Sequence, residues 1–237
     1  NTNLFSDIRV GSGSSSPESL TVVGNKMFFT ANDGINGREL WVTDGTTVSL
    51  VKDIYPGATG SSPEELVASG GKLFFSADHP TFGEELWVSD GTEAGTTLVS
   101  DIYPGSSDSR IESMVSFTGG RVIFKARTAD AGEELWIADN STATLLKDIV
   151  PGMSSSDPQE LYKIPGKRLV YFSAFTLEHG RELWRTDGTA AGTVFVSDLY
   201  LGEDYSAPRD FHYRKRKLYF SALDKEKGRE LFSVRVN

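Results

Sequence analysis

The sequence predicts an all-β fold, a five-bladed β-propeller with four antiparallel strands in each blade. Three observations lead to this expectation. One unit, with a period of 46 to 49 residues, occurs five times along the chain, and each unit carries four short strand signals. The two ends of the chain also complement each other, because the last unit lacks its fourth strand and the first residues match only that strand.

The repeat is defined by motifs at fixed spacing. A pentapeptide that begins with Asp and ends with Gly follows the outer strand, and a Glu-Leu-Trp or Glu-Leu-Phe sequence lies later in each unit. The pentapeptides begin at Asp7, Asp53, Asp101, Asp148 and Asp198. The glutamates are Glu39, Glu85, Glu134, Glu182 and Glu230, which are 46, 49, 48 and 48 residues apart. This period is typical of a four-stranded propeller blade.

Each unit reads as four strands, here called A to D. In the second unit we expect them at residues 66–68, 72–77, 85–89 and 96–102, and no segment has a helical period. Gly70-Gly71 predicts the A–B turn, and Asp90-Gly91 begins the C–D turn. The whole chain, residues 1–237, is therefore expected to be one domain. Its blades cover residues 17–57, 63–105, 111–152, 158–202, and 208–237 together with 1–11.

The chain ends predict how the ring closes. The last unit reaches Glu230-Leu231-Phe232 and stops at Asn237, so it has strands A, B and C but no strand D. Residues 3–8 match only a strand D. We therefore expect the N-terminal strand to complete the last blade, which closes the ring and removes an exposed sheet edge.

Composition narrows the classes of partner. The formal net charge is −9, and an acidic surface repels phosphate backbones and anionic membranes, so nucleic acid is not expected as a partner. The chain has no cysteine, which excludes disulfides and cysteine-based zinc sites. No apolar run reaches the roughly 18 residues of a membrane span, so membrane insertion is not expected. The chain begins at Asn1, which favours a processed, exported product.

One segment carries a family resemblance. Residues 85–96, ELWVSDGTEAGT, resemble the ELWxxDGT repeats of exported bacterial proteins, and residues 98–105 continue that pattern. The third copy departs from it at Asp139-Asn140-Ser141, and the fifth ends before this turn. The resemblance implies a β-propeller and an extracellular or exported location, but little chemistry. In length and number of units the chain is also similar to five-bladed tachylectin-2-like lectins, whose motifs are absent, so that likeness is architectural.

The recurring residues have structural interpretations. The aromatic residue after each Glu-Leu pair lies mid-strand, where both faces of a blade pack on its neighbours, so we expect Trp41, Trp87, Trp136, Trp184 and Phe232 in the core between blades. The five recurring Glu and five recurring Asp residues are expected to accept backbone N–H bonds that hold loops, because a buried carboxylate needs such partners. Sugar stacking by the aromatics and direct ligand contact by the acids are the alternatives.

Loop lengths indicate which face binds a ligand. The D–A linkers and B–C loops keep constant lengths in all copies, and because strand direction alternates they share one face of the predicted disc. Constant length is also explained by architecture alone. The B–C loops are polar and differ in sequence, and tyrosines occur in three linkers. The candidate ligand-binding residues are Asp33, Asn36, Arg38, Tyr55, Asp78, His79, Tyr103, Arg127, Asp130, Glu178, His179, Arg181, Tyr200, Asp224 and Arg229.

Three functions are weighed. The first is a multivalent lectin-like protein that binds glycans or glycoconjugates through repeated shallow sites, where several weak sites gain through avidity. The second is a structural or adhesive module of a larger exported protein. The third is a glycoside hydrolase, for which Glu65, Glu160 and Asp210 are the only carboxylates that break the symmetry; these acids could equally hold Ca²⁺. We expect the first, with no catalytic residue, no metal site and no required cofactor.

Overall fold

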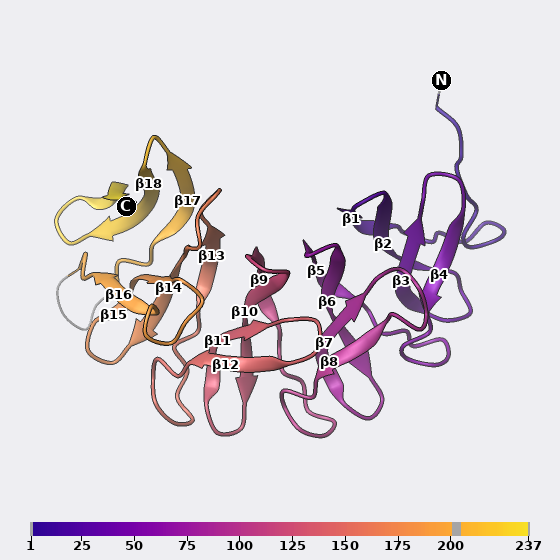
Figure 1. The fold of residues 1–237 in the computed structure, drawn as a ribbon, viewed down its shortest axis with the longest axis horizontal. Coiled ribbons are helices and arrows are strands. Elements are labelled where there is room, and N and C mark those ends of the chain that lie inside the picture. Colours follow the sequence, from indigo (N-terminus) through magenta and orange to yellow (C-terminus); the bar gives the residue numbers. More distant parts are fainter. Residues whose placement is uncertain (1, 201–204, 237) are drawn as a thin grey trace. The chain divides into compact units, whose positions relative to one another are not determined.

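The computed structural model describes residues 2–200 and 205–236 of the chain. Regular structure in this part consists of nineteen β-strands arranged in five antiparallel sheets, four of four strands and one of three (Figure 1). No helix in the described residues is long and apolar enough to cross a membrane. The predicted limits at residues 1, 202 and 237 lie outside the described residues.

Each sheet follows the order of the chain from strand A to strand D. The first sheet contains β1 (Glu18–Val23), β2 (Lys26–Asn32), β3 (Arg38–Thr43) and β4 (Val48–Lys52), and the second β5 (Glu64–Ser69), β6 (Lys72–His79), β7 (Gly83–Ser89) and β8 (Thr97–Ser100). The third contains β9 (Glu112–Phe117), β10 (Arg121–Thr128), β11 (Gly132–Ala138) and β12 (Ala143–Lys147). The fourth contains β13 (Gln159–Lys163), β14 (Val170–Thr176), β15 (Gly180–Thr186) and β16 (Val194–Ser197), and the last β17 (Arg209–Arg214), β18 (Lys217–Asp224) and β19 (Gly228–Arg235). The predicted repeat, and the prediction of four strands in each unit, are confirmed for the first four units.

The chain divides into two compact units. The first unit holds the sheets β1–β4 and β5–β8, and the second holds β13–β16, β17–β19 and most of β9–β12. Within the first unit β1 lies beside β5, and within the second unit β13 lies beside both β9 and β17. Neighbouring sheets thus meet through their A strands, as blades do around a propeller axis.

Apolar cores form between neighbouring sheets of each unit. In the first unit Phe28 and Leu40 of one sheet pack on Phe75 and Trp87 of the next, and all four side chains are buried. In the second unit Trp184 belongs to a similar core between the third and fourth sheets. The predicted core position of the recurring tryptophans is confirmed for these two residues. Close-packed aromatics at this position explain why a large side chain recurs in every unit.

Four A strands contain a bulge that the sequence did not predict. The register of β1, β5, β13 and β17 shifts after their first residue. The residues at the shift have a left-handed backbone although they are not glycine: φ is 56° at Ser19, 52° at Glu65, 55° at Ser113, 58° at Glu160 and 59° at Asp210. A bulge of this kind bends the strand and increases its twist. This shared backbone geometry explains why these positions are equivalent in all five units.

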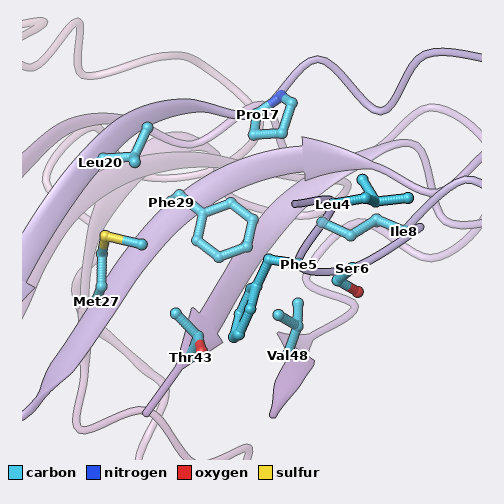
Figure 2. Close-up of a pocket in the computed structure, with 10 residues that line it drawn as sticks. All are labelled: Leu4, Phe5, Ser6, Ile8, Pro17, Leu20, Met27, Phe29, Thr43 and Val48. Carbon is cyan, nitrogen blue, oxygen red and sulfur yellow. The ribbon is translucent and has the colours of Figure 1, made fainter. Parts of the chain in front are cut away.

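The expected fourth strand of the last blade is not formed. Residues 2–8 contain no strand, and in the described residues β17–β18–β19 is a three-stranded sheet. Instead, Leu4, Phe5 and Ile8 line a groove of about 240 Å³ together with Phe29 and Val48 of the first sheet (Figure 2). The physical reason is apolar contact between these residues and the first sheet. The contact is loose, since Leu4 remains 82% exposed and Phe5 59%.

Candidate ligand-binding site

Four buried glutamates hold the D–A linkers in place. Glu39, Glu85, Glu134 and Glu182 are 0% exposed, and each accepts hydrogen bonds from N–H groups of the linker that follows its own blade. Glu134 is the fullest case: its carboxylate accepts from the N–H groups of Ile149 (3.0 Å), Val150 (3.3 Å) and Ser156 (2.8 Å), and from Ser156 Oγ (2.6 Å). The expectation that the recurring glutamates fix the loops is confirmed for these four.

Burial changes the acidity of these four glutamates, which we call the clamps. Removal from water raises the pKa of Glu39 and of Glu85 to about 7, although the N–H and hydroxyl donors act in the opposite direction. Burial also raises the pKa of Glu134 and Glu182.

We expect the melting temperature to fall as the pH rises from 5 to 8. The carboxyls of Glu39 and Glu85 have an ordinary pKa of 4.5 and a folded-state pKa of about 7, so between these values the folded chain holds more protons than the unfolded chain. Their stabilising contribution is full below pH 4.5 and is lost as the pH rises through 7. Thermal melts followed by circular dichroism test this. The double variant Glu39→Gln/Glu85→Gln should flatten the profile, and a stability that increases over this range would contradict the expectation.

A pocket lies beside one such linker. In the second unit, residues 149–151 of the linker, residues 176–179 of the B–C turn, Trp184 and Phe195 line a cavity of about 420 Å³. The lining belongs to two successive blades, on the face where the linkers and the B–C turns meet. This is the face on which the loop lengths predicted ligand binding.

His179 is held firmly in this pocket. Its ring stacks on Phe195, with centroids 4.6 Å apart, and Phe195 meets Trp184 edge-on at 5.7 Å. The Nδ1 atom of His179 shares a hydrogen bond of 3.3 Å with Oδ2 of Asp198, the first residue of the last pentapeptide in the chain. Glu178 lies at the other side of the ring, 3.6 Å from Nε2. These rings form an aromatic surface, which we call the shelf, with an imidazole and a carboxylate at its edge.

The first unit builds a similar shelf from different positions. His79 stacks on Phe82 at 4.8 Å and tilts toward Trp87 at 5.9 Å. By the repeat, Phe82 corresponds to His179, whereas the phenyl ring of the fourth blade comes from Phe195 in the D strand β16. Burial lowers the pKa of His79, and Lys52 acts in the same direction. The ring of His79 is therefore neutral at pH 7, as suits a hydrogen-bonding group on a shelf.

Comparison with solved structures assigns the fold class. Puromycin hydrolase, free and as a mutant complexed with PGG, matches with a TM-score of 0.55 in both cases and 14% identity. The matches cover 94% and 92% of this chain but only 37% and 36% of the hydrolase. The β-propeller domain of the Trilobed protease from Pyrococcus furiosus matches with a TM-score of 0.48 and 13% identity, over 92% of this chain and 68% of that one. Together with the repeated antiparallel sheets, the puromycin hydrolase match shows that the chain has a β-propeller fold.

Sequence comparison adds no family. Neither the protein-family models nor the curated proteins give a match to the chain. The chain spans about a third of the length of puromycin hydrolase. At such low identity the likeness concerns the propeller fold alone.

Several candidate residues of the propeller hold loops. The guanidinium groups of Arg38, Arg181 and Arg229 donate to the linker carbonyls of Ser16, Asp157 and Ala207, at 3.1, 2.7 and 3.1 Å. All three acceptor residues have a left-handed backbone, which these bonds stabilise. Asp33 and Asp224 accept N–H bonds inside their own B–C turns, and Asn36 donates its amide to Asp33.

The remaining candidates are dispersed over the propeller. Asp78 lines a second cavity, of about 120 Å³, with Glu64 and Glu84, and burial together with Asp108 and Glu64 raises the pKa of Asp78. Tyr55 and Tyr103 donate their backbone N–H groups to Glu39 and Glu85. Asp130 is exposed, whereas Arg127 and Tyr200 are half-buried. The structure therefore gathers His179 and Glu178 in one pocket and places His79 on its own shelf.

The acids considered for catalysis have structural contacts. Oδ2 of Asp210 accepts a bond of 2.8 Å from Ser221 Oγ, and Glu160 accepts a weak bond of 3.4 Å from the N–H of Asp210. Within the described residues no group of three or more His, Asp or Glu side chains is placed to bind a metal ion.

The features that sequence reasoning missed are Phe82 and Phe195. Their signal was an aromatic residue in a B–C turn and in a D strand.

Proposed function

We propose that the chain is a multivalent carbohydrate-binding propeller, an ELWxxDGT-type module of an exported protein. The observation that supports this best is the cavity of about 420 Å³ beside His179, which is lined by two successive blades. It is shallow and combines rings with charged or polar groups. Such a surface can stack on the apolar face of a sugar ring while polar groups at its edge bond the hydroxyls.

The repeat extends the proposal to other blades. Tyr55 occupies in the first linker the position that Val150 occupies in the third, and His79 with Phe82 supplies the shelf next to it. Two or more weak sites of this kind raise the avidity for a polyvalent glycan well above the affinity of one site. A glycan surface is thus a better target for this arrangement than a single small sugar.

A glycan array, run with calcium and with a chelator, tests the function. We expect binding to a restricted set of glycans. His179→Ala and His79→Ala should each lower the array signal, and the double variant should lower it at least tenfold. Asp139→Ala, in an exposed C–D turn, is the matched control. No binding to any glycan would replace the lectin proposal by that of an adhesive protein module, and turnover of a chromogenic glycoside would replace it by a hydrolase.

We also propose that the working form is a ring closed by residues 2–8. The support comes from Glu230, the fifth equivalent of the clamp glutamates, which lacks the hydrogen-bond donors that the other four have. Glu230 is exposed, and its carboxylate has no hydrogen-bond partner among the described residues. Its four equivalents are buried. Ser15 is the fifth equivalent of Ser61, Ser156 and Ser206. Its carbonyl already accepts the N–H of Asn32 at 2.9 Å, as the carbonyl of Ser61 accepts that of Asp78 at 2.8 Å.

Closure would also cover exposed apolar groups. Leu231 is 75% exposed, whereas the equivalent Leu40, Leu86, Leu135 and Leu183 are 0–1% exposed. Burying one leucine side chain stabilises a fold by roughly 1.5–3 kcal/mol. A strand D formed by residues 2–6 would pair with β19 and cover this side chain together with Phe5.

A further inference from the structure

The A–B turn of the last sheet carries a concentrated positive charge. Arg214, Lys215, Arg216 and Lys217 follow one another, and Arg235 pairs with Lys217 in the neighbouring strand. All five side chains are exposed, and within residues 2–200 and 205–236 none of them forms an ion pair. This occurs in a chain whose formal net charge is −9. Five cations without ion pairs, in this turn and beside it, are therefore a local feature that the net charge of the chain does not reveal.

The backbone of this turn is unfavourable for the residues that form it. Lys215 and Arg216 both have a left-handed backbone, with φ of 48° and 63°. The second sheet makes the same turn with Gly70 and Gly71, at 60° and 80°. Glycine adopts this conformation without strain, whereas a residue with a Cβ does not. Strained positions of this kind persist at functional sites, and here the strain keeps two cations at the tip of the hairpin.

The position of Arg214 is also unusual. Its equivalents Val23, Ser69, Phe117 and Ile164 are uncharged and buried. In the last sheet Arg214 instead lines a cavity of about 490 Å³ with His212, Lys215 and Tyr219. The equivalents of Tyr219, Phe28 and Phe74, are buried, so this cavity is a part of the last sheet that a neighbouring blade would cover, and the exposed turn beside it carries the remaining cations.

We propose that this cationic turn, residues 214–217 with Arg235, binds an acidic polysaccharide through its sulfate or carboxylate groups. Clusters of Lys and Arg are typical of sites for heparin-like polymers and nucleic acids. The net negative charge of the chain repels a long polyanion as a whole, so the turn would engage only a short anionic stretch of the polymer. The site is distinct from the shelves of His79 and His179, because A–B turns and B–C turns lie at opposite ends of the strands.

Ring closure is compatible with this site. The equivalent turn residues Gly24 and Gly70 stay exposed although their sheets are packed on a neighbour. Lys26, the equivalent of Lys217, donates to the carbonyl of Asp90 in the C–D turn of the next blade. In a closed ring Lys217 would be engaged in the same way and Arg214 would be covered as Val23 is, so Lys215, Arg216 and Arg235 would remain available.

The variant Lys215→Gly/Arg216→Gly separates binding from folding. It removes two charges and supplies the residues that the second sheet uses, so its melting temperature should rise. Its affinity for heparin, measured by calorimetry in 50 mM NaCl, should fall at least tenfold, and the salt dependence of log K should lose a slope of about two. The control Lys225→Ser/Lys227→Ser removes the same charge from the other end of the sheet and should bind like the parent chain.

Four outcomes would overturn the proposal. These are heparin affinity unchanged in the glycine variant, an equal loss in the control, binding of inorganic sulfate as strong as that of the polymer, and tighter binding of a polynucleotide than of heparin. Neutral dextran serves as the blank. Because this assay uses no neutral glycan, its failure leaves the array result for the His79 and His179 shelves unaffected.

Discussion

Replacing Glu134 by alanine should lower the free energy of unfolding by about 3 kcal/mol or more. Its carboxylate is the acceptor for three linker N–H groups and one serine hydroxyl, all 2.6–3.3 Å away. Removing it leaves these buried donors without partners, and each orphaned donor costs about 1–3 kcal/mol, partly relieved by entering water. For a chain of this size, 3 kcal/mol corresponds to a loss of roughly 6–12 °C in melting temperature. Thermal and urea unfolding measure both quantities.

The size of the effect should depend on the acceptor and not on the charge. Glu134→Gln keeps one oxygen in place and resembles the protonated acid that burial favours, so it should cost less than half as much as the alanine variant. Glu93→Ala, on an exposed turn, should change stability by no more than about 0.5 kcal/mol. Equal losses in the glutamine and alanine variants would show that the linker does not depend on these hydrogen bonds.

The repeat made most of the fold predictable. Each strand limit inferred for the second unit falls within a few residues of β5–β8, because Gly70-Gly71 and Asp90-Gly91 mark turns through their backbone freedom. The loop-holding role of the glutamates was predictable for the same reason. A carboxylate that recurs in every unit beside buried positions needs the same donors in every unit.

Other features carried no such signal. The left-handed residues of the A strands are serine, glutamate and aspartate, which are common elsewhere in the chain, so residue type does not reveal the bulge. The shelves were hidden because Phe82 and His179 are equivalent in position but exchange roles, and Phe195 comes from another strand. Lys215 and Arg216 are poor turn formers, so their turn could not be read from propensity.

Glu230→Ala measures whether the ring closes. In a closed ring Glu230 accepts from the linker at residues 8–15, and its loss should cost about as much as that of Glu134, roughly 3 kcal/mol. Deleting residues 1–8 should destabilise the chain at least as strongly. Ser15→Ala should then show a coupling energy with Glu230→Ala of about 1 kcal/mol, because the two side chains would share one hydrogen bond. A neutral Glu230→Ala variant would mean that the edge of β19 stays open.

A cysteine pair fixes the register of the proposed strand. In the first sheet Val42 pairs with Ser49. Counting from the repeated motifs, Ser233 corresponds to Val42 and Asn3 to Ser49, so Asn3→Cys/Ser233→Cys should form a disulfide within one chain. The background is clean because the chain contains no cysteine, and Val42→Cys/Ser49→Cys is the positive control. Free thiols would contradict closure. A disulfide that links two chains would mean that the N-terminal strand completes the blade of a second copy, since the edge of β19 needs a partner strand in either case.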